Sequence, residues 1–466
     1  MHIHWHRRDL RPADNRGLSA GTERGPVVPV FVFDPTILTH ASSVRVAAML
    51  EALSTLRDSY RAHDSDLVVA HGEPSAVLPD LASEYGANGV SWNDDYSGLA
   101  RERDRAVTAS LEDADLEVTT CQDAIAHEPG SITPNQGEHY SVFSYFWTKW
   151  RDRTKADPVD PPAADELAAV EGEPLPTVAE LGFDEPEASL PAVTRPAGQA
   201  RLESFCREDI YRYAEDRDYP AREGTSRLSA HLTWGTLGVR EVYAATEDAI
   251  ARARSDADRE SVWEFRRQLA WREFYAHVLA YNPEIVRENV SRYEREIEWR
   301  TAPDEFAAWQ RGETGYPIVD AGMRQLRAEG WMHNRVRMLV ASFLTKDLLI
   351  DWRAGYDWFR RKLVDHDTAN DVGGWQWAAS TGTDAQPYFR VFNPMTQGER
   401  YDPDAAYIRE YVPELEGVPA EAIHAWDDLE PTRRRDLAPD YPAPIVDHAD
   451  RRELAIETFE RARGDD

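Results

Sequence analysis

The stretch VVPVFVFD at residues 27–34 is a short run of β-branched and aromatic residues. Such a run is typical of a strand that is buried on both faces of a parallel sheet. Four similar runs occur before residue 122, at HIHW 2–5, DLVVAHG 66–72, GVSWND 89–94 and LEVTTC 116–121, and amphipathic segments lie between them at 45–61, 76–85 and 100–111. This alternation predicts an α/β domain over 1–121 with a doubly wound parallel sheet, whose ligand sites lie beyond the carboxyl ends of the strands.

The rest of the chain divides where its composition changes. Residues 122–197 are rich in proline, glycine and acidic residues and predict a long surface connector, with the aromatic stretch at 139–150 as its one ordered part. Over 198–466 the helical period replaces the strand signals, which predicts an all-α domain. The first strand is followed by RRDLRPADNRG at 7–17 instead of a glycine-rich phosphate loop, so a dinucleotide-binding Rossmann domain is disfavoured.

Composition excludes several classes of protein. The chain has 466 residues and a net charge of −31, yet its 42% hydrophobic and 10% aromatic residues exclude a disordered acidic chain. No stretch approaches the ~18–20 apolar residues of a membrane span, and charge near the N-terminus argues against a signal peptide. We therefore expect a cytoplasmic protein without a membrane partner. Cys121 and Cys206 have no partners at metal-ligand spacing, so we expect two buried, inert thiols, no disulfide and no metal.

Lysine is scarce among the 53 basic residues. It occurs only at positions 149, 155, 346 and 362. An acidic surface with so little lysine predicts a protein that works in concentrated salt, where counterions screen the repulsion between carboxylates. A GC-rich genome would also favour arginine over lysine, so the lysine count alone is weak support for a halophilic host.

Two helical segments of the second half carry polar groups beside large apolar ones. In the first, an amide, an indole, a guanidinium and a phenol fall at i, i+3, i+4 and i+7 and share one face of the helix: Gln268, Trp271, Arg272 and Tyr275. In the second, Asn334 and Met338 are spaced i, i+4, with Arg337 beside them. Such faces are typical of the wall of a binding site, although core packing alone would account for any one tryptophan.

Two loops carry groups that bind ligands in other proteins. The run GTSRLS at 224–229 combines backbone N–H groups, hydroxyls and a fixed cation, as a phosphate site requires, or it is an ordinary helix N-cap. Asp365, Asp367 and Asp371 crowd a second loop before the glycines at 373–374. That loop could be a cation site or a solvated turn, and its residues alone leave both interpretations open.

Taken together and in order, these segments resemble the DNA photolyase/cryptochrome flavoprotein family, most closely a class I cyclobutane pyrimidine dimer photolyase of a halophilic archaeon. The resemblance covers roughly 1–121 and 198–415, and its motifs are WHRRDLRPADN at 5–15, EGTSRLSAHLTWG at 223–235, WREFY at 271–275, TGYPIVDAGMRQL at 314–326, the segment from GWMHNRVRM at 330 to W352, and GGWQWAASTGTDAQPYFRVFNP at 373–394. It implies an antenna chromophore in the α/β domain and FAD in the helical domain.

The resemblance also implies roles for single residues. FAD would be bound by Tyr213, Thr225, Ser226, Arg227, Leu228, Ser229, Gln268, Arg272, Asn334, Arg337, Asp365, Asp367 and Asp371. Among these, Tyr213 and the 225–229 loop would hold the diphosphate, Arg337 and Asp365 would form an ion pair beside the isoalloxazine, and Asp367 would touch the ribose or adenine. An electron would reach the photoexcited flavin along the tryptophans Trp299, Trp352 and Trp375.

The implied reaction is light-driven repair of damaged DNA by a monomeric carbon–carbon lyase. The flipped-out cyclobutane dimer would stack on Trp271 and Trp377, with Gln268, Asn334 and Met338 as further contacts. Arg335 and Arg390 would hold phosphates beside the lesion. Residues 324–362 carry nine basic and four acidic side chains, or +5, so we expect this segment to meet the DNA although the whole chain is acidic.

Four positions separate members of the family. Asn334 and Met338 stand where photolyases for the 6-4 photoproduct have two histidines, which favours cyclobutane dimers. Gln268 replaces a glutamate that is common in bacterial enzymes, and glutamine is typical of 6-4 photolyases. Asp371 replaces an asparagine that faces flavin N5, as in plant cryptochromes; burial should raise its pKa, so that it could donate to N5. A cryptochrome blue-light receptor and a 6-4 photolyase therefore remain the alternatives.

The resemblance also bears on the antenna chromophore. Ala100 stands where the methenyltetrahydrofolate type has a glutamate, whereas Arg45 and Asp95 match positions of the deazaflavin type. We therefore expect an 8-hydroxydeazaflavin more than methenyltetrahydrofolate.

Overall fold

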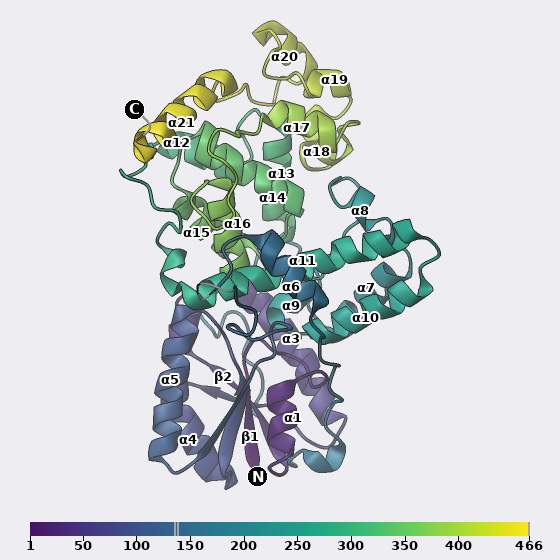
Figure 1. The fold of residues 1–466 in the computed structure, drawn as a ribbon, viewed down its shortest axis with the longest axis vertical. Coiled ribbons are helices and arrows are strands. Elements are labelled where there is room, and N and C mark those ends of the chain that lie inside the picture. Colours follow the sequence, from purple (N-terminus) through teal and green to yellow (C-terminus); the bar gives the residue numbers. More distant parts are fainter. Residues whose placement is uncertain (135–136, 138, 465–466) are drawn as a thin grey trace.

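The structure is a computed structural model that describes residues 1–134, 137 and 139–464. It consists of an α/β part, which holds both the N-terminus and the sheet, and a helical part that lies above it and ends at the C-terminus (Figure 1). The predicted fold class, an α/β domain followed by a helical one, is confirmed.

The sheet has five strands in the order β3-β2-β1-β4-β5, and all neighbours pair in parallel. These strands are β1 (His2–His6), β2 (Val27–Phe33), β3 (Val68–His71), β4 (Gly89–Asn93) and β5 (Glu117–Cys121). Ile3 of the central strand lies opposite Val28 on one side and Val90 on the other. The strand order reverses between β1 and β4, which in open α/β sheets opens a crevice at the carboxyl ends of the strands.

Helices cover both faces of the sheet. On one face α1 (Arg16–Thr22) and α3 (Ser43–Arg61) pack with Val27 and Phe31; on the other, α4 (Pro74–Tyr85) and α5 (Gly98–Asp113) pack with Val28 and Val30. Helix α1 is a short element that the sequence patterns did not predict. It lies close to the sheet because Gly17 has no side chain: a Cβ there would lie 2.9 Å from the Asn93 Oδ1 atom.

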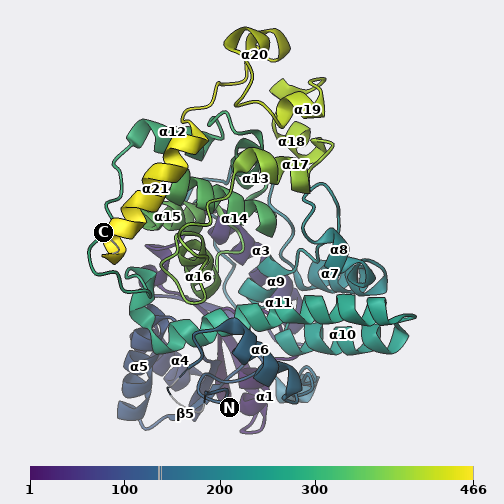
Figure 2. The same ribbon diagram turned by 45° about the horizontal axis from the view of Figure 1, so that its top comes forward.

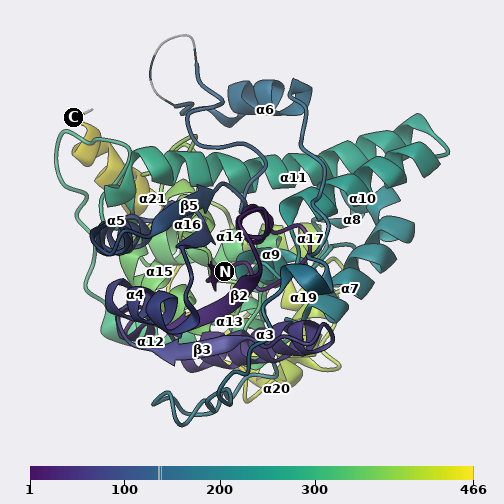
Figure 3. The same ribbon diagram turned by 90° about the horizontal axis from the view of Figure 1, so that it is seen from below.

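The predicted connector is largely irregular but docks on both parts of the molecule. Its aromatic stretch forms α6 (Phe143–Asp152), which runs beside α11 (Asp256–Tyr281) (Figure 3). The connector then passes η1 (Ala164–Glu166), and Leu167 makes an isolated bridge with Val27. The predicted boundary at 197/198 falls inside α7 (Arg195–Arg207), and connector residues 135, 136 and 138 lie outside the described residues.

The second half of the chain is helical, and no strand follows β5 within the described ranges. Helix α11, with 26 residues, is the longest and crosses the domain (Figure 2). After α7 and besides α11, the elements are η2 (Asp209–Tyr211), α8 (Tyr213–Asp216), α9 (Ser229–Trp234), α10 (Val239–Arg252), η3 (Pro283–Val286), α12 (Pro303–Arg311), α13 (Pro317–Glu329), α14 (Asn334–Ser342), the π-helical turn η4 (Phe343–Asp347), α15 (Trp352–Lys362), α16 (Thr368–Ala378), α17 (Pro394–Tyr401), α18 (Ala406–Tyr411), η5 (Pro413–Leu415), α19 (Ala420–Ile423), α20 (Pro431–Leu437) and α21 (His448–Arg463).

Two expectations from composition can be compared with the structure. Among the described residues, no helix is long and apolar enough to cross a membrane. Both cysteines are free; Cys206 is buried as expected, but Cys121 is only half-buried. The expectation of two buried thiols is wrong for Cys121 because it ends β5, an edge strand whose side chains are partly open to solvent.

A buried cluster of two arginines and two aspartates joins the two parts of the molecule. Arg11 and Asp14 follow β1, Asp123 follows β5, and Arg240 comes from α10. Arg11 contacts Asp123 at 2.5 Å, and Arg240 contacts Asp14 at 2.6 Å and also pairs with Asp123. The four side chains are at most 3% exposed. Each charge thus has partners of opposite sign, which is how buried charges are tolerated.

We expect Arg240→Met to lower the free energy of unfolding by roughly 3–5 kcal/mol, because it leaves Asp14 and Asp123 buried with one guanidinium in place of two. Denaturant unfolding of the full chain measures this. Asp113→Asn, at the exposed end of α5, is the control and should change stability by less than about 0.5 kcal/mol. A loss below about 1 kcal/mol for Arg240→Met would show that the cluster does not hold the domains together.

Candidate functional site

Three helices and one loop bring the predicted site residues together. Helix α16 packs against both α11 and α14. Gly373 allows the close approach of α16 to α11, because a Cβ at this position would overlap the ring of Tyr275. The α11 residues around Trp271 therefore lie beside the α16 residues around Asp371, although about a hundred residues separate them in the sequence.

The predicted phosphate loop is held in a fixed conformation before α9. The Arg201 guanidinium donates to the carbonyls of Ser226 (3.0 Å) and Thr225 (3.2 Å). Arg227 has a φ of 49°, in the left-handed region, and its guanidinium lies 4.4 Å from the centre of the Trp331 ring. A loop with its carbonyls held in this way presents its remaining polar groups in a defined arrangement, as an anion site requires. Tyr213 is buried against Phe205 and Phe265.

The predicted pair of Arg337 and Asp365 is present. Arg337 contacts Asp365 Oδ2 at 2.7 Å and also donates to the Met332 carbonyl at 2.8 Å. The Oδ1 atom of Asp365 is buried and has no hydrogen-bond partner among the described residues. An orphaned carboxylate oxygen beside a paired arginine is an acceptor that a bound group with N–H donors, such as a flavin ring, would satisfy.

Asp371 is buried near this pair and has a partner that the sequence did not reveal. His366 Nδ1 lies 2.6 Å from Asp371 Oδ2. Burial raises the pKa of Asp371, in the direction expected from the sequence, although the contact with His366 opposes that rise. Burial also lowers the pKa of His366. Burial thus favours the neutral form of both groups.

Asp367 lies at the junction between the two parts of the molecule. It caps α16 by accepting from the Asn370 N–H at 3.0 Å, and Arg8 of the loop after β1 contacts it at 2.7 Å. Burial alone would raise the pKa of Asp367, but Arg8 and Arg272 hold it well below its usual range. Asp367, Arg8 and Arg272 line a small cavity of about 70 Å³ between the domains, so the structure does bring two of the predicted FAD residues together.

The three predicted relay tryptophans lie on segments that contact one another. Trp375 is buried and contacts Gly355 of α15, and Trp352 begins that same helix. The backbone N–H of Arg300, next to Trp299, donates to the Leu349 carbonyl at 2.7 Å, just before Trp352. Trp299 is only partly buried, and its ring lies 5.9 Å from that of Phe459 in α21. Trp375 and Trp352 are both buried and Trp299 is the partly exposed member, and the electron relay along them stays a prediction.

The predicted lesion contacts occupy α11, α14 and α16. Trp271 and Trp377 are both half-buried, and Asn334 is exposed, with its Nδ2 atom 3.9 Å from Met338 Sδ. Gln268 Nε2 donates to the Glu264 Oε1 atom at 3.2 Å, which orients the amide.

Trp271 has a partner from the connector. The ring of Phe143, the first residue of α6, stacks on it with centroids 3.6 Å apart and planes 10° from parallel. Phe143 is itself buried, and its N–H donates to Asp384 Oδ2 at 3.2 Å. One face of the Trp271 indole is thus covered by a fixed aromatic ring.

The predicted phosphate contacts differ from each other. Arg390 is exposed, whereas Arg335 pairs with Asp218 at 2.8 Å and lies over the Tyr401 ring at 4.4 Å. Arg335 would have to leave Asp218 before it could hold a phosphate.

Several cations of 324–362, the segment expected to meet DNA, are already engaged within the protein. Arg324 pairs with Glu414, Arg337 with Asp365 and Arg353 with Asp351, while Lys346 is buried. The acidic partners of Arg324 and Arg337 come from outside the segment, and contact of the segment with DNA stays a prediction.

Arg45 and Asp95 line one cavity of about 440 Å³ between the carboxyl edge of the sheet and the helical part, hereafter the interdomain cavity. Its wall also includes Trp234, Tyr356 and His366. Burial and the neighbouring Arg360 lower the pKa of Arg45 to about 10. A hollow with these dimensions and a crowded cationic side fits an aromatic ligand that carries an anionic group.

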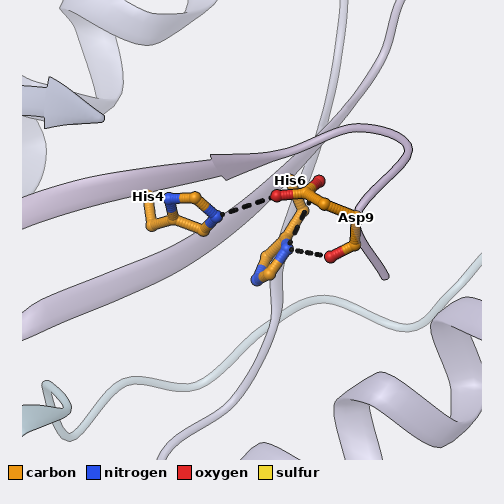
Figure 4. Close-up of side chains that lie close together, drawn as sticks. All are labelled: His4, His6 and Asp9. Atoms are coloured by element: carbon orange, nitrogen blue, oxygen red, sulfur yellow. Dashed lines mark hydrogen bonds and ion pairs between the residues drawn. The ribbon is translucent and has the colours of Figure 1, made fainter. Parts of the chain in front are cut away.

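One further polar cluster lies where β1 ends. His4 and His6 both face Asp9, with His4 Nε2 at 3.3 Å from Asp9 Oδ2 (Figure 4). Asp9 also accepts from the side-chain amides of Asn15 (3.0 Å) and Asn93 (2.5 Å). Burial lowers the pKa of His4 to about 4, so its imidazole is neutral. The cluster uses its ligand atoms internally and fixes the loop at 7–15; we assign it no metal.

Comparisons with known proteins identify the family of this chain. Residues 2–165 match the family described as DNA photolyase, and residues 265–461 match the one described as the FAD binding domain of DNA photolyase. A relative from the halophilic archaeon Halobacterium salinarum, named deoxyribodipyrimidine photo-lyase, is 59% identical over all of this chain and all of its own. This chain belongs to the DNA photolyase family.

Solved structures of the family share the whole fold. A bacterial class III photolyase from Agrobacterium tumefaciens has a TM-score of 0.91 and 36% identity, covering 99% of this chain and 98% of its own. An archaeal photolyase from Sulfolobus tokodaii, solved with two FAD molecules, has a TM-score of 0.83 and 33% identity, with 99% of each chain covered.

Sequence reasoning missed three residues of the site. Phe143 lay in the aromatic stretch of the connector, but no pattern showed that it meets α11. His366 stood between two of the predicted aspartates, which was a signal that could have been used. Arg8 was part of the quoted RRDLR motif, but its partner Asp367 is 359 positions away.

We expect Phe143→Leu to weaken binding of an oligonucleotide with a single cyclobutane dimer by about two- to tenfold, because it removes an aromatic stack worth ~0.5–1.5 kcal/mol behind Trp271. Fluorescence anisotropy in the dark measures this, and thermal unfolding checks that the variant is folded. Tyr145→Leu is the matched control, since Tyr145 is also in α6 but 66% exposed. Equal affinities for Phe143→Leu and the parent would contradict a role for this stack.

Proposed function

We propose that this chain repairs cyclobutane pyrimidine dimers in DNA under light. The observation that carries the proposal is the 59% identity over full length with a relative named deoxyribodipyrimidine photo-lyase. The lesion-contact residues on α11, α14 and α16 support it, because they lie on helices that pack together. When bound, reduced FAD supplies the light-driven electron that opens the cyclobutane ring and takes the electron back. Binding of the cofactor and of the lesion is the work of this protein's own side chains.

The helical domain supplies the groups that would hold FAD. The matched FAD binding domain begins at residue 265, within α11, and covers Arg337, Asp365, Asp367 and Asp371. Arg337 and Asp365 would fix the ring system through the orphaned Asp365 oxygen, and the loop at 225–229 would hold the phosphates. This division of roles follows the chemistry of the groups: a paired carboxylate accepts from ring N–H groups, while hydroxyls and a cation suit phosphate.

The lesion face would work by stacking and by polar contacts. Extruding damaged bases costs a few kcal/mol, and stacking on aromatic rings recovers ~1–3 kcal/mol per base. Trp271 is supported from behind by Phe143, so it can offer a fixed indole without an ordering cost at binding. The Gln268 amide, oriented by Glu264, can donate and accept hydrogen bonds but cannot hand over a proton.

The residues on α14 favour cyclobutane dimers over the 6-4 photoproduct. Asn334 and Met338 offer an amide and a thioether, neither of which titrates near neutral pH. The nearby His333 is buried, and burial lowers its pKa to about 4, so it is no substitute for an exposed acid–base histidine. Repair of a cyclobutane dimer needs no general acid at this face.

Recognition of DNA would depend on the lesion more than on the backbone. The chain carries −31, and many of its arginines are paired internally, which leaves few free phosphate contacts such as Arg390. Affinity for undamaged DNA should then be low and only weakly dependent on salt. This mode of binding suits a protein that works in concentrated salt.

A single assay separates this proposal from its two alternatives. The reduced protein is illuminated with an oligonucleotide that carries one defined lesion, and restored thymines are measured by chromatography. We expect light-dependent loss of the cyclobutane dimer with multiple turnovers and no loss of the 6-4 photoproduct. Persistence of both lesions would favour a cryptochrome, and repair of the 6-4 lesion alone would favour the other photolyase type. Illumination without protein and protein in the dark are the controls.

We further propose that the interdomain cavity holds the antenna chromophore, an 8-hydroxydeazaflavin. The position of Arg45 and Asp95 in one cavity supports this, as does the cationic side formed by Arg45 and Arg360. We expect Arg45→Leu to lose the second chromophore from the purified protein while FAD remains bound. Absorbance spectra and chromatography of the released chromophores measure this. Release of a folate or of a second flavin from the parent would contradict the proposed ligand.

A further inference from the structure

The contact between His366 and Asp371 joins two sites that the reaction described above keeps apart. His366, in the loop before α16, lies in the wall of the interdomain cavity. Asp371 lies in the first turn of α16, on the side predicted for the flavin, and its N–H donates to the Asp367 carbonyl at 2.8 Å. With 2.6 Å between His366 Nδ1 and Asp371 Oδ2, the pair spans the layer between cavity and cofactor site.

The charges around the pair are mixed. Arg337 and Asp365 face Asp371 from α14 and from the loop before α16. Arg45 from α3 and Asp367, the N-cap residue of α16, face His366, and the Tyr356 ring of α15 lies 5.8 Å from the imidazole. Burial raises the pKa of Tyr356 to about 12, so this phenol stays protonated. His366 and Asp371 thus each have both a cation and an anion nearby, and no single neighbour holds either group in its charged form.

Burial acts on the two partners in opposite senses. It lowers the pKa of the imidazole and raises that of the carboxyl group, so both neutral forms are favoured. The hydrogen bond between them works against both shifts. A short contact between groups whose proton affinities are brought together in this way allows the proton to reside on either atom, and the two groups titrate as a pair.

We propose that His366 and Asp371 form a proton relay from the interdomain cavity to the flavin side of α16. The imidazole accepts a proton at Nε2 from water that enters the cavity, whose hydroxide returns to solvent, and it releases the proton on Nδ1 to Asp371 Oδ2. One proton enters and one leaves, so the imidazole changes only its tautomer. Asp371 then carries a proton that it can give to a flavin that has taken up an electron. This role deepens the proposed function and rests on the binding of FAD beside Asp371.

The proposal accounts for the combination of residues in this chain. An asparagine at 371 could hydrogen-bond to a flavin but could not accept and release a proton. An aspartate there without a titrating partner would be cut off from solvent, because it is buried. His366 connects Asp371 to the cavity, because an imidazole can take up a proton at one nitrogen while it releases one from the other. His366 acts through Asp371 and is therefore a positioning residue.

Three variants separate a relay from a merely structural hydrogen bond. His366→Asn keeps an N–H donor near the position of Nδ1 but has no second nitrogen that titrates. His366→Ala removes both functions, and Asp371→Asn removes the acceptor. All are studied as flavin-loaded full-length protein without DNA.

The first readout is made in the dark. Infrared spectra follow the carboxylic acid band of Asp371 against pH, assigned by its loss in Asp371→Asn, and ¹⁵N spectra of labelled histidine follow His366, assigned by its loss in His366→Asn. We expect the carboxyl band of the parent to disappear in a transition that also changes the His366 signal. Independent titration of the two groups, or a His366 signal that Asp371→Asn leaves unchanged, would overturn the proposal.

The second readout is the rate at which the flavin gains a proton after light-driven reduction, followed by absorbance in H₂O and D₂O. We expect His366→Asn and His366→Ala each to slow this step by about tenfold or more, since general acid catalysis contributes factors of ~10²–10⁴. A rate in His366→Asn equal to the parent would show that only the hydrogen bond matters and would overturn the relay. Should His366→Ala fail to fold, His366→Asn alone decides.

Failure of the relay and failure of the proposed function have different signatures. The dark spectra and the proton-uptake rate use no DNA, so they test the relay even if the parent repairs no dimer. The repair assay on the parent, in turn, needs no variant of His366 or Asp371.

Discussion

The buried cluster of Arg11, Asp14, Asp123 and Arg240 is the constraint on which the arrangement of the domains depends. Asp14 and Asp123 follow two different strands, and Arg240 belongs to the helical part, so the cluster ties the carboxyl edge of the sheet to α10. Because each charge would be strongly unfavourable alone in the interior, the four must be buried together. The edge of the sheet is thereby fixed against the helical domain, and the interdomain cavity lies at this same edge.

The loop at 7–15 connects this buried cluster to the functional site. The buried cluster of His4, His6 and Asp9 fixes one end of the loop, and Arg8 extends from it to Asp367 at the start of α16. The position of α16 in turn determines where Asp371, Trp375 and Trp377 lie relative to α11 and α14. The two domains are thus joined through polar contacts that are buried or partly buried.

The acidic excess of the whole chain and the basic excess of residues 324–362 have different physical consequences. The acidic excess of −31 belongs to the chain as a whole, where salt can screen it. The apparent basic excess of 324–362 is mostly used inside the protein, because Arg324, Arg335 and Arg337 find carboxylates on other elements. A local sum of charges could not show this, since the partners Glu414, Asp218 and Asp365 lie outside the segment. The chain therefore presents fewer free cations to DNA than the sequence led us to expect.

The sequence by itself determined the two-part fold and all five strands, because strand runs and helical periods are local properties of the chain. It also located the Arg337–Asp365 pair and the two residues of the interdomain cavity through resemblance to a family. Only the tertiary structure decided that Phe143 supports Trp271, that His366 bonds to Asp371, that Arg335 is already paired and that Cys121 is partly open. These facts concern which side chains meet across long separations in sequence. Such contacts depend on how helices and loops pack in three dimensions, and no local pattern of residues specifies that packing.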